Sequence, residues 1–184
     1  GNGKFERKAL PLECQFAPIF GMLTGDYNND GHTDVLITGN SYSTEVSTGA
    51  YDAMTGILLT GNGEGNFKTF VSSTTGFKAD DDSKGIAALP ISANAAIILS
   101  ANNDGDLKTY AFATNNITSA QAGKNDVYAV IQKKDGKTYR QEFYWGNSYL
   151  SNSSRGLSFN RSLVSSVIYY DNKGNKRQVI DNSK

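Results

Sequence analysis

Hydrophobic residues in this chain fall in short runs that turn residues separate at intervals of about ten positions. The runs in the N-terminal part occupy 17–25, 34–40, 56–62, 66–71, 84–91, 95–102 and 107–113. Each run has the length of a β-strand, which predicts an all-β chain. The nearly continuous apolar centres of 34–40 and 56–62 predict strands that are covered on both faces.

The C-terminal third contains two longer segments, each with a glycine turn near its centre. Residues 127–145 turn at Gly136, and residues 164–180 turn at Gly174. Glycine supplies the positive φ that tight hairpins need. Two antiparallel hairpins are therefore predicted in this part of the chain.

Charge is distributed unevenly along the chain. The formal net charge is zero, yet residues 1–123 hold 7 Lys and Arg against 13 Asp and Glu, whereas residues 124–184 hold 11 against 5. This change of sign, together with the polar stretch 114–126, predicts a linker and a boundary between two units, 1–123 and 124–184. The basic residues of the second unit are scattered, so we expect a solvated surface that faces an acidic neighbour and no nucleic-acid partner.

Residues 26–34 carry the pattern D-x-N-x-D-G-x-x-D between two strand-like runs. A hard cation such as Ca²⁺ takes about six to eight oxygens, and a short loop supplies them when alternate side chains converge on one point. The predicted ligands are the side chains of Asp26, Asn28, Asp30 and Asp34 and the main-chain carbonyl of His32. An EF-hand would have a glutamate where Ile37 stands and helices on both sides. The pattern predicts a calcium site of another kind, and the alternative is an Asx-rich turn without metal.

The segment APIFGMLTGDYNNDGHTDVLITGN, followed by GILLTGNGEGNFKTF, resembles an FG-GAP (VCBS-type) repeat, the calcium-loop blade of integrin-like β-propellers. The resemblance implies that the five residues above bind Ca²⁺ between two strands of one blade. The runs in 84–113 repeat the order of those in 17–71 without such a loop, so this second blade is expected to bind no metal there. Residues 102–106 (NNDGD) have the composition of the loop but not its spacing, and are expected to form a hairpin turn.

The tail is similar to a second family. The segment YRQEFYWGNSYLSNSSRGLSFN, with VSSVIYYDNKGNKR after it, resembles the ASPIC/UnbV domain. It departs from the family at 160–162, where Asn-Arg-Ser replaces a Gly-Leu-Gly-like turn, and at Tyr169 or Tyr170, where the family has tryptophan. The two resemblances together match the layout of cartilage acidic protein-like proteins and their bacterial relatives in the Bacteroidetes.

This layout implies an all-β fold: a partial β-propeller of about two FG-GAP-like blades, followed by a small β-sandwich or barrel-like ASPIC/UnbV domain. It also implies a C-terminal fragment, with the rest of the propeller lying N-terminal to it. An open blade edge is then expected to permit self-association.

The polar insertion 40–56 interrupts the calcium blade and is a candidate ligand surface, because loops on a rigid scaffold commonly carry binding. Its candidate ligand-binding residues are Asn40, Tyr42, Glu45, Tyr51 and Asp52. The alternative is a loop that caps the blade or packs against the tail.

The sequence offers little for catalysis. Cys14 is the only cysteine and is expected to be a small buried hydrophobe, and the only histidine is His32 in the predicted metal loop. A Ser/His/Asp or Cys/His arrangement would therefore need His32. Paired carboxylates stay formally open, with Glu45 and Asp52 or the triplet 80–82, but the triplet is interpreted as a solvated turn. No catalytic residues are assigned and we expect no enzyme.

The expected function is a non-catalytic, calcium-stabilised binding module for a glycan or a protein. A pure protein-interaction scaffold with structural calcium is the alternative, and a carbohydrate-active enzyme fragment comes third. The expected location is extracellular, at the cell surface or periplasmic, in association with a bacterial outer membrane. The sequence contains no apolar run long enough for a transmembrane helix.

Overall fold

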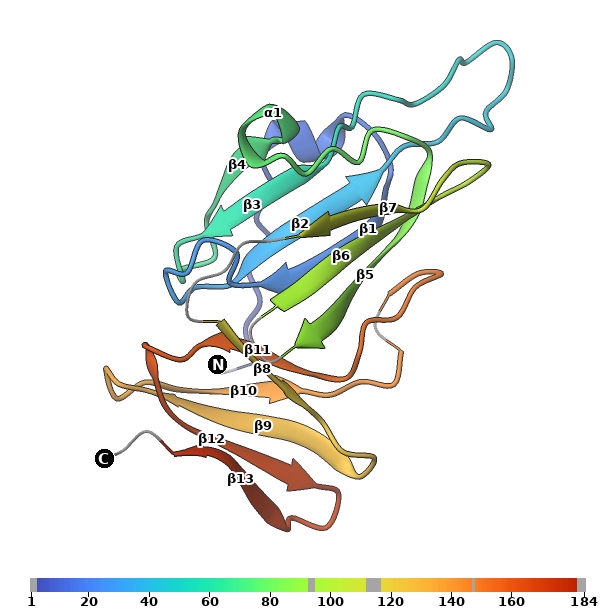
Figure 1. Cartoon of the computed structure of the whole chain (residues 1–184). Coiled ribbons are helices and arrows are strands. Elements are labelled where there is room, and N and C mark those ends of the chain that lie inside the picture. The colour runs from blue at the N-terminus through green and yellow to red at the C-terminus, as the bar shows by residue number, and fades with distance from the viewer. Residues whose placement is uncertain (1–2, 93–94, 112–116, 147, 182–184) are drawn as a thin grey trace.

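The computed structural model describes residues 3–92, 95–111, 117–146 and 148–181. The protein is all-β, which confirms the predicted class, and the antiparallel strands in these ranges form four sheets (Figure 1). In the described ranges none of these sheets closes on itself. The helices described are single turns, η1 (Leu12–Gln15) and α1 (Ser72–Thr75). No described helix is long and apolar enough to cross a membrane.

Seven strands of the N-terminal half form two sheets. The four-stranded sheet has the order β1 (Ile19–Gly25), β2 (Asp34–Gly39), β3 (Ile57–Gly61) and β4 (Phe67–Val71). The three-stranded sheet has the order β5 (Ser83–Ser92), β6 (Ala95–Asn102) and β7 (Lys108–Ala111). All seven predicted runs are confirmed to within two residues at each end, apart from residues 112 and 113, which lie outside the described residues. The expected hairpin turn at 102–106 joins β6 to β7.

An apolar core lies on each face of the first sheet. The core toward the second sheet contains Leu23, Leu36, Leu58, Phe77, Ala79, Ile86 and Ile98. The opposite core contains Cys14, Ala17, Ile37, Met54, Ile57 and Leu59. Leu36 and Ile37 are neighbours on β2, and successive residues of a strand point to opposite faces. The prediction of strands covered on both faces is confirmed, and Cys14 is a free, buried cysteine as predicted.

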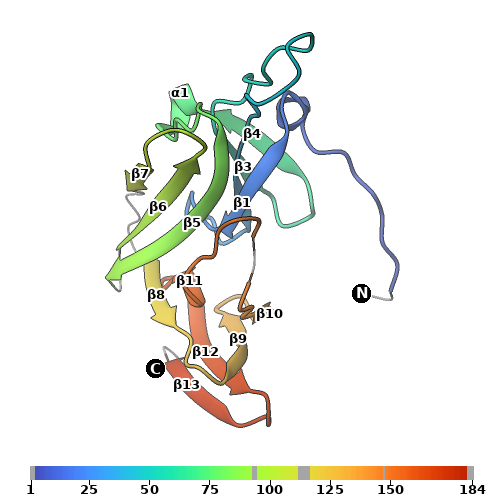
Figure 2. The same ribbon diagram turned by 90° about the vertical axis from the view of Figure 1, so that its right-hand side faces the viewer.

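The two sheets meet where β1 and β5 lie side by side (Figures 1 and 2). A Cβ on Gly21 of β1 would come within 2.6 Å of Ile86 Cγ2 on β5. A side chain at this position would therefore force the two strands apart.

The C-terminal half has a four-stranded sheet and a two-stranded ribbon. The sheet has the order β10 (Thr138–Glu142), β9 (Asp126–Lys133), β12 (Val164–Asp171) and β13 (Lys176–Asp181). The ribbon pairs β8 (Ile117–Gln121) with β11 (Gly156–Asn160). Both predicted hairpins are confirmed. The buried core of this half contains Ala129, Ile131, Phe143, Leu157, Phe159, Val164, Val167 and Tyr169.

The expected linker at 114–126 is wrong over 117–121, which form β8, while 114–116 lie outside the described residues. The strand is stabilised by tertiary partners: the hydroxyls of Ser119 and Ser158 are 2.9 Å apart, and Tyr169 OH donates to the carbonyl of Ala120 at 2.7 Å. The division at 123/124 stays a prediction, and β8 pairs across it with β11.

The two halves contact each other along β5. The main-chain N–H of Ile86 donates to Ser151 Oγ at 3.3 Å, and that of Ala88 donates to Ser153 Oγ at 3.0 Å. The N–H of Ser154 returns a bond to the carbonyl of Ala88 at 3.3 Å. Among the described residues β5 is an outer strand of its sheet, and these bonds from the tail cover part of its edge.

A second contact joins the halves at the loop between β1 and β2. Lys133 Nζ donates to the carbonyl of Gly31, and Asn160 Nδ2 donates to the carbonyl of Asn29 at 3.4 Å. A Cβ on Gly31 would come within 2.8 Å of Leu163 Cδ1. The tail therefore packs directly on the predicted calcium loop.

Candidate functional site

The 26–34 loop joins β1 to β2. Gly25, the last residue of β1, and Asp34, the first residue of β2, lie opposite each other in the ladder. Asn29 and Gly31 have φ values of 64° and 82°. These two left-handed residues turn the chain sharply, as the glycine of the motif predicted.

The side-chain oxygens of the loop accept hydrogen bonds from its own main chain. Asp26 accepts the N–H groups of Asp30 and Gly31 at 3.1 and 2.9 Å. Asn28 Oδ1 accepts the N–H of Asp30 at 3.0 Å, and Asp30 Oδ1 accepts that of His32 at 2.8 Å. The bonds of Asn28 and Asp30 are Asx-turn bonds, whereas those of Asp26 span four and five residues. All of them shape the loop and leave further lone pairs on the side-chain oxygens.

Asp34 is wholly buried and ties the loop to β3. Its Oδ2 accepts the N–H groups of Tyr27 and Asn28 at 2.8 and 3.3 Å, and its Oδ1 accepts that of Gly61 at 2.9 Å. These three bonds fix the position of the carboxylate between the loop and β3. Among the described residues no basic side chain forms an ion pair with Asp34.

The loop concentrates negative charge in a partly buried place. Burial raises the pKa of the Asp26 carboxyl, the N–H of Gly31 lowers it, and the charges of Asp30 and Asp34 raise it again, with a net rise. Neighbouring carboxylates repel each other, and a cation among them removes this repulsion.

Three carboxylates, one amide and one main-chain carbonyl on a single loop fit the hard-oxygen preference of Ca²⁺. The His32 ring packs against Gly63, where a Cβ would lie 2.5 Å from Nδ1. The ligand predicted from this residue is its main-chain carbonyl, not the ring. As the side chains are placed, no three acidic, histidine or cysteine groups in the described ranges form a metal-binding group.

Asn40, a predicted ligand-binding residue, is buried at the base of the insertion. Its Nδ2 donates to the carbonyls of Met54 and Asp81 at 2.8 and 3.1 Å, and its Oδ1 accepts the N–H of Met54 at 2.9 Å. The amide therefore holds the two ends of the insertion together and faces away from solvent.

The other predicted ligand-binding residues of the insertion are exposed. Tyr42 and Tyr51 are each 46% exposed, which leaves part of both rings open to a ligand. Burial raises the pKa of Tyr42, and the charges of Asp81 and then Asp52 raise it further. Glu45 lies instead in the turn at the tip, where its carbonyl accepts the N–H of Thr48 at 2.9 Å.

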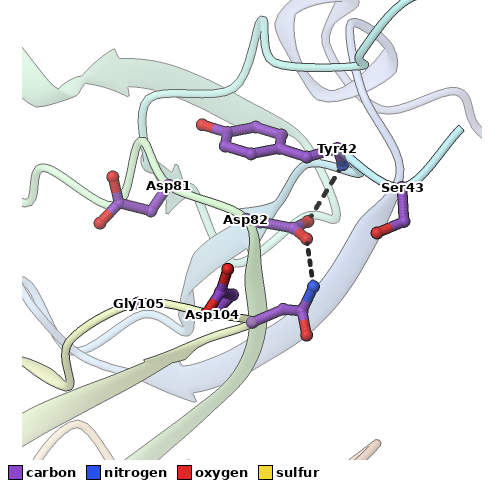
Figure 3. A pocket seen from close by; sticks show the side chains of 7 residues that line it. Tyr42, Ser43, Asp81, Asp82, Asp104 and Gly105 are labelled. Carbon is purple, nitrogen blue, oxygen red and sulfur yellow. Dashed lines mark hydrogen bonds between the residues drawn. The ribbon is translucent and has the colours of Figure 1, made fainter. Parts of the chain in front are cut away.

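The base of the insertion faces an acidic recess of about 340 Å³ that the sequence reasoning missed (Figure 3). It is lined by Tyr42, Ser43, Asp81, Asp82, Asn103, Asp104 and Gly105. No local pattern could have indicated it, because the three segments that form it are far apart in the sequence.

The interpretation of the triplet 80–82 as a solvated turn is wrong for Asp82, which is 2% exposed. Lys84 Nζ lies 2.6 Å from Asp82 Oδ1, and Lys108 Nζ lies 3.0 Å from Asp80 and 2.6 Å from Asp81. All three carboxylates thus form ion pairs with lysines of the fold. Lys78 and Lys84 flank the triplet in the sequence and could have indicated part of this ion pairing. Lys108, which pairs with Asp80 and Asp81, lies on β7 and could not have been found from the local sequence.

Comparison with models of known protein families and with curated proteins found no match for this chain. The FG-GAP and ASPIC/UnbV resemblances therefore rest on the motifs quoted above. Function has to be argued from the site itself, since a fold alone does not define one.

Proposed function

We propose that this protein is a non-catalytic, calcium-stabilised binding module that works outside the cell, at the cell surface or in the periplasm, on a glycan or a protein. The observation that carries the proposal is the 26–34 loop. It holds Asp30 and Asp34 close enough to Asp26 for their charges to raise the pKa of the Asp26 carboxyl, and Asp34 is buried without a basic partner in the described chain. Ca²⁺ would supply the missing positive charge.

The arrangement of the first two sheets supports the finer assignment as neighbouring blades of a β-propeller. They have four and three antiparallel strands and pack with β1 beside β5. The loop would then be the FG-GAP calcium loop of the first blade, and the tail would be an ASPIC/UnbV-like domain.

A protein-interaction scaffold is the second candidate. Within the described residues β4 and β7 are outer strands of their sheets. Outer strands present unpaired main-chain groups that another chain can extend, including a second copy of this one.

The test of the calcium proposal is thermal unfolding in EDTA and in Ca²⁺. Ca²⁺ binds only the folded loop, so we expect it to stabilise the protein by about 2.7 kcal/mol at a concentration of roughly 100 times Kd, and to raise the Tm. Asp30→Asn keeps a hydrogen-bond acceptor but removes a charge. Its Tm should respond less to Ca²⁺, while its Tm in EDTA should be no lower than that of the wild type, because repulsion with Asp26 is relieved.

Asp104→Asn is the matched control, because Asp104 lies in the other Asn-Asp-Gly turn, which lacks the spacing of a metal loop. It should keep the full response to Ca²⁺. A wild-type Tm that is the same in EDTA and in Ca²⁺ would contradict the proposal.

A further inference from the structure

A cleft of about 1010 Å³ runs between the two halves, and residues of both line it. Its volume is at the upper end of the range for small-molecule sites, and such sites favour the junction of two bodies. The two contacts described above also line it, through Gly31 and Lys133 on one side and Ala88 and Ser153 on the other. The walls are therefore fixed to each other by hydrogen bonds.

The lining is rich in neutral hydrogen-bonding side chains. The N-terminal half contributes Thr24 and Asn62, and the C-terminal half contributes Ser119, Gln121 and Gln141. Amides and hydroxyls both donate and accept, so they suit a ligand whose surface alternates donors and acceptors.

Two tyrosines complete the C-terminal wall. Tyr139 and Gln141 lie two residues apart on β10 and so share one face of the strand. Tyr139 is 40% exposed and Tyr144 is 61% exposed. Exposed aromatic rings beside hydrogen-bonding groups can stack on the apolar C–H face of a sugar ring while the neighbours bond its hydroxyls.

The cleft is lined by equal numbers of acidic and basic side chains, and several of them bond to other groups of the protein. Acidic lining residues are Asp26, Glu64 and Glu142, and basic ones are Lys133, Lys137 and Arg155. Lys133 donates to Gly31, Glu142 pairs with Arg140 at 2.6 Å, and Arg155 donates to main-chain carbonyls. The cleft thus has no excess charge of either sign to favour an ionic ligand.

We infer that this cleft is the ligand site and that its ligand is a neutral oligosaccharide, stacked on Tyr139 and Tyr144 and hydrogen-bonded by Gln121 and Gln141. This inference rests on the proposed function. It specifies that the ligand is a glycan and that it binds in the cleft between the two halves. The exposed tyrosines of the 40–56 insertion are then outside the site.

The test is titration calorimetry on the full chain with cellohexaose, xylohexaose, maltohexaose and mannohexaose as neutral probes and hexagalacturonate as the charged one. We expect a neutral probe to bind and hexagalacturonate to bind at least about tenfold more weakly. Tyr144→Ala and Gln141→Ala change exposed side chains and should each weaken binding about tenfold with no change in Tm. Tyr139→Ala should weaken it at least as much.

Tyr51→Ala is the matched control. The side chain of Tyr51 is 46% exposed, a fraction similar to the 40% of Tyr139, but it lies on the insertion and not in the cleft. It should leave the affinity unchanged. Binding lost in Tyr51→Ala and kept in the cleft variants would overturn the inference, as would preference for hexagalacturonate, or a peptide as the only ligand.

The calcium measurement separates the two proposals. If Ca²⁺ raises the Tm but no neutral probe binds, the cleft inference fails and a calcium-stabilised module with a protein ligand stands. If a neutral probe binds in the cleft of a protein that ignores Ca²⁺, the metal proposal fails and the cleft inference stands.

Discussion

Asp82 is held on three sides directly before β5. Besides Lys84, it accepts the N–H of Tyr42 at 3.3 Å and Asn103 Nδ2 at 3.0 Å. Burial alone would raise the pKa of this carboxyl, but the bonds from Lys84 and Asn103 outweigh burial and hold the pKa below its ordinary value. This side chain thereby joins the insertion, β5 and the turn after β6.

The lowered pKa of Asp82 predicts a pH dependence. Its contribution to stability is complete above its unfolded pKa of about 3.9 and is lost as the pH falls through the lower folded pKa. We expect Asp82→Asn to lower the free energy of unfolding by about 1–3 kcal/mol at pH 7, and by less near pH 3. Urea unfolding of both proteins at the two pH values measures this difference.

Asp135→Asn, on the exposed turn between β9 and β10, should behave like the wild type at both pH values. If Asp82→Asn lost the same stability at pH 3 as at pH 7, the ion pair would not be the source of its effect.

Residues whose contacts are local in the sequence were predictable, whereas residues that bond to distant segments were not. The positions of the 26–34 loop act within nine residues, so their spacing predicted the sharp turn that the structure has at Asn29 and Gly31. The set of metal ligands stays a prediction. Asn40 bonds to residues 14 and 41 positions away, and nothing adjacent to it in the sequence indicates that it is buried. The sequence therefore did not predict that the Asn40 amide would be buried and would hold the ends of the insertion together.

Strands with apolar centres were predictable from their pattern, but β8 and β11 were not. Their sequences, ITSAQ and GLSFN, carry small and polar residues, and each becomes a strand only because the other pairs with it. Strand preference depends on such neighbours more than on the backbone itself. The cleft was unpredictable for the same reason, since its walls come from distant segments.

Gly39 at the end of β2 tests the close packing of the first sheet. A Cβ there would lie 1.9 Å from the carbonyl oxygen of Pro18, a main-chain atom that cannot rotate away. We expect Gly39→Ala to lower the free energy of unfolding by about 2–3 kcal/mol, because the ladder between β1 and β2 must shift. Thermal or urea unfolding measures the loss.

Gly146→Ala is the control for this change, since nothing lies within 4 Å of its added Cβ. It should be neutral. A Gly39→Ala protein as stable as the Gly146→Ala protein would show that β1 and β2 are less tightly paired here than described.

The contact between the tail and the 26–34 loop joins the two halves of the molecule and should slow the opening of that loop. We expect the double variant Lys133→Met/Asn160→Ala to exchange the amide hydrogens of residues 28–32 about tenfold faster than the wild type, because two bonds to the loop carbonyls are lost. Hydrogen exchange followed by mass spectrometry measures this rate.

Lys137→Met removes a lysine that is 80% exposed on the neighbouring turn and should leave the exchange unchanged. Equal rates in the wild type and the double variant would mean that the loop is ordered without the tail.

The serines that bond to β5 have a geometric consequence. Ser151 and Ser153 are two residues apart, and so are their donors Ile86 and Ala88, so the tail follows the pleat of the strand. A slip of one residue would place the hydroxyls opposite groups that point the other way. The tail can therefore dock only in steps of one pleat, roughly 7 Å, and its position along β5 is set by discrete registers rather than by continuous sliding.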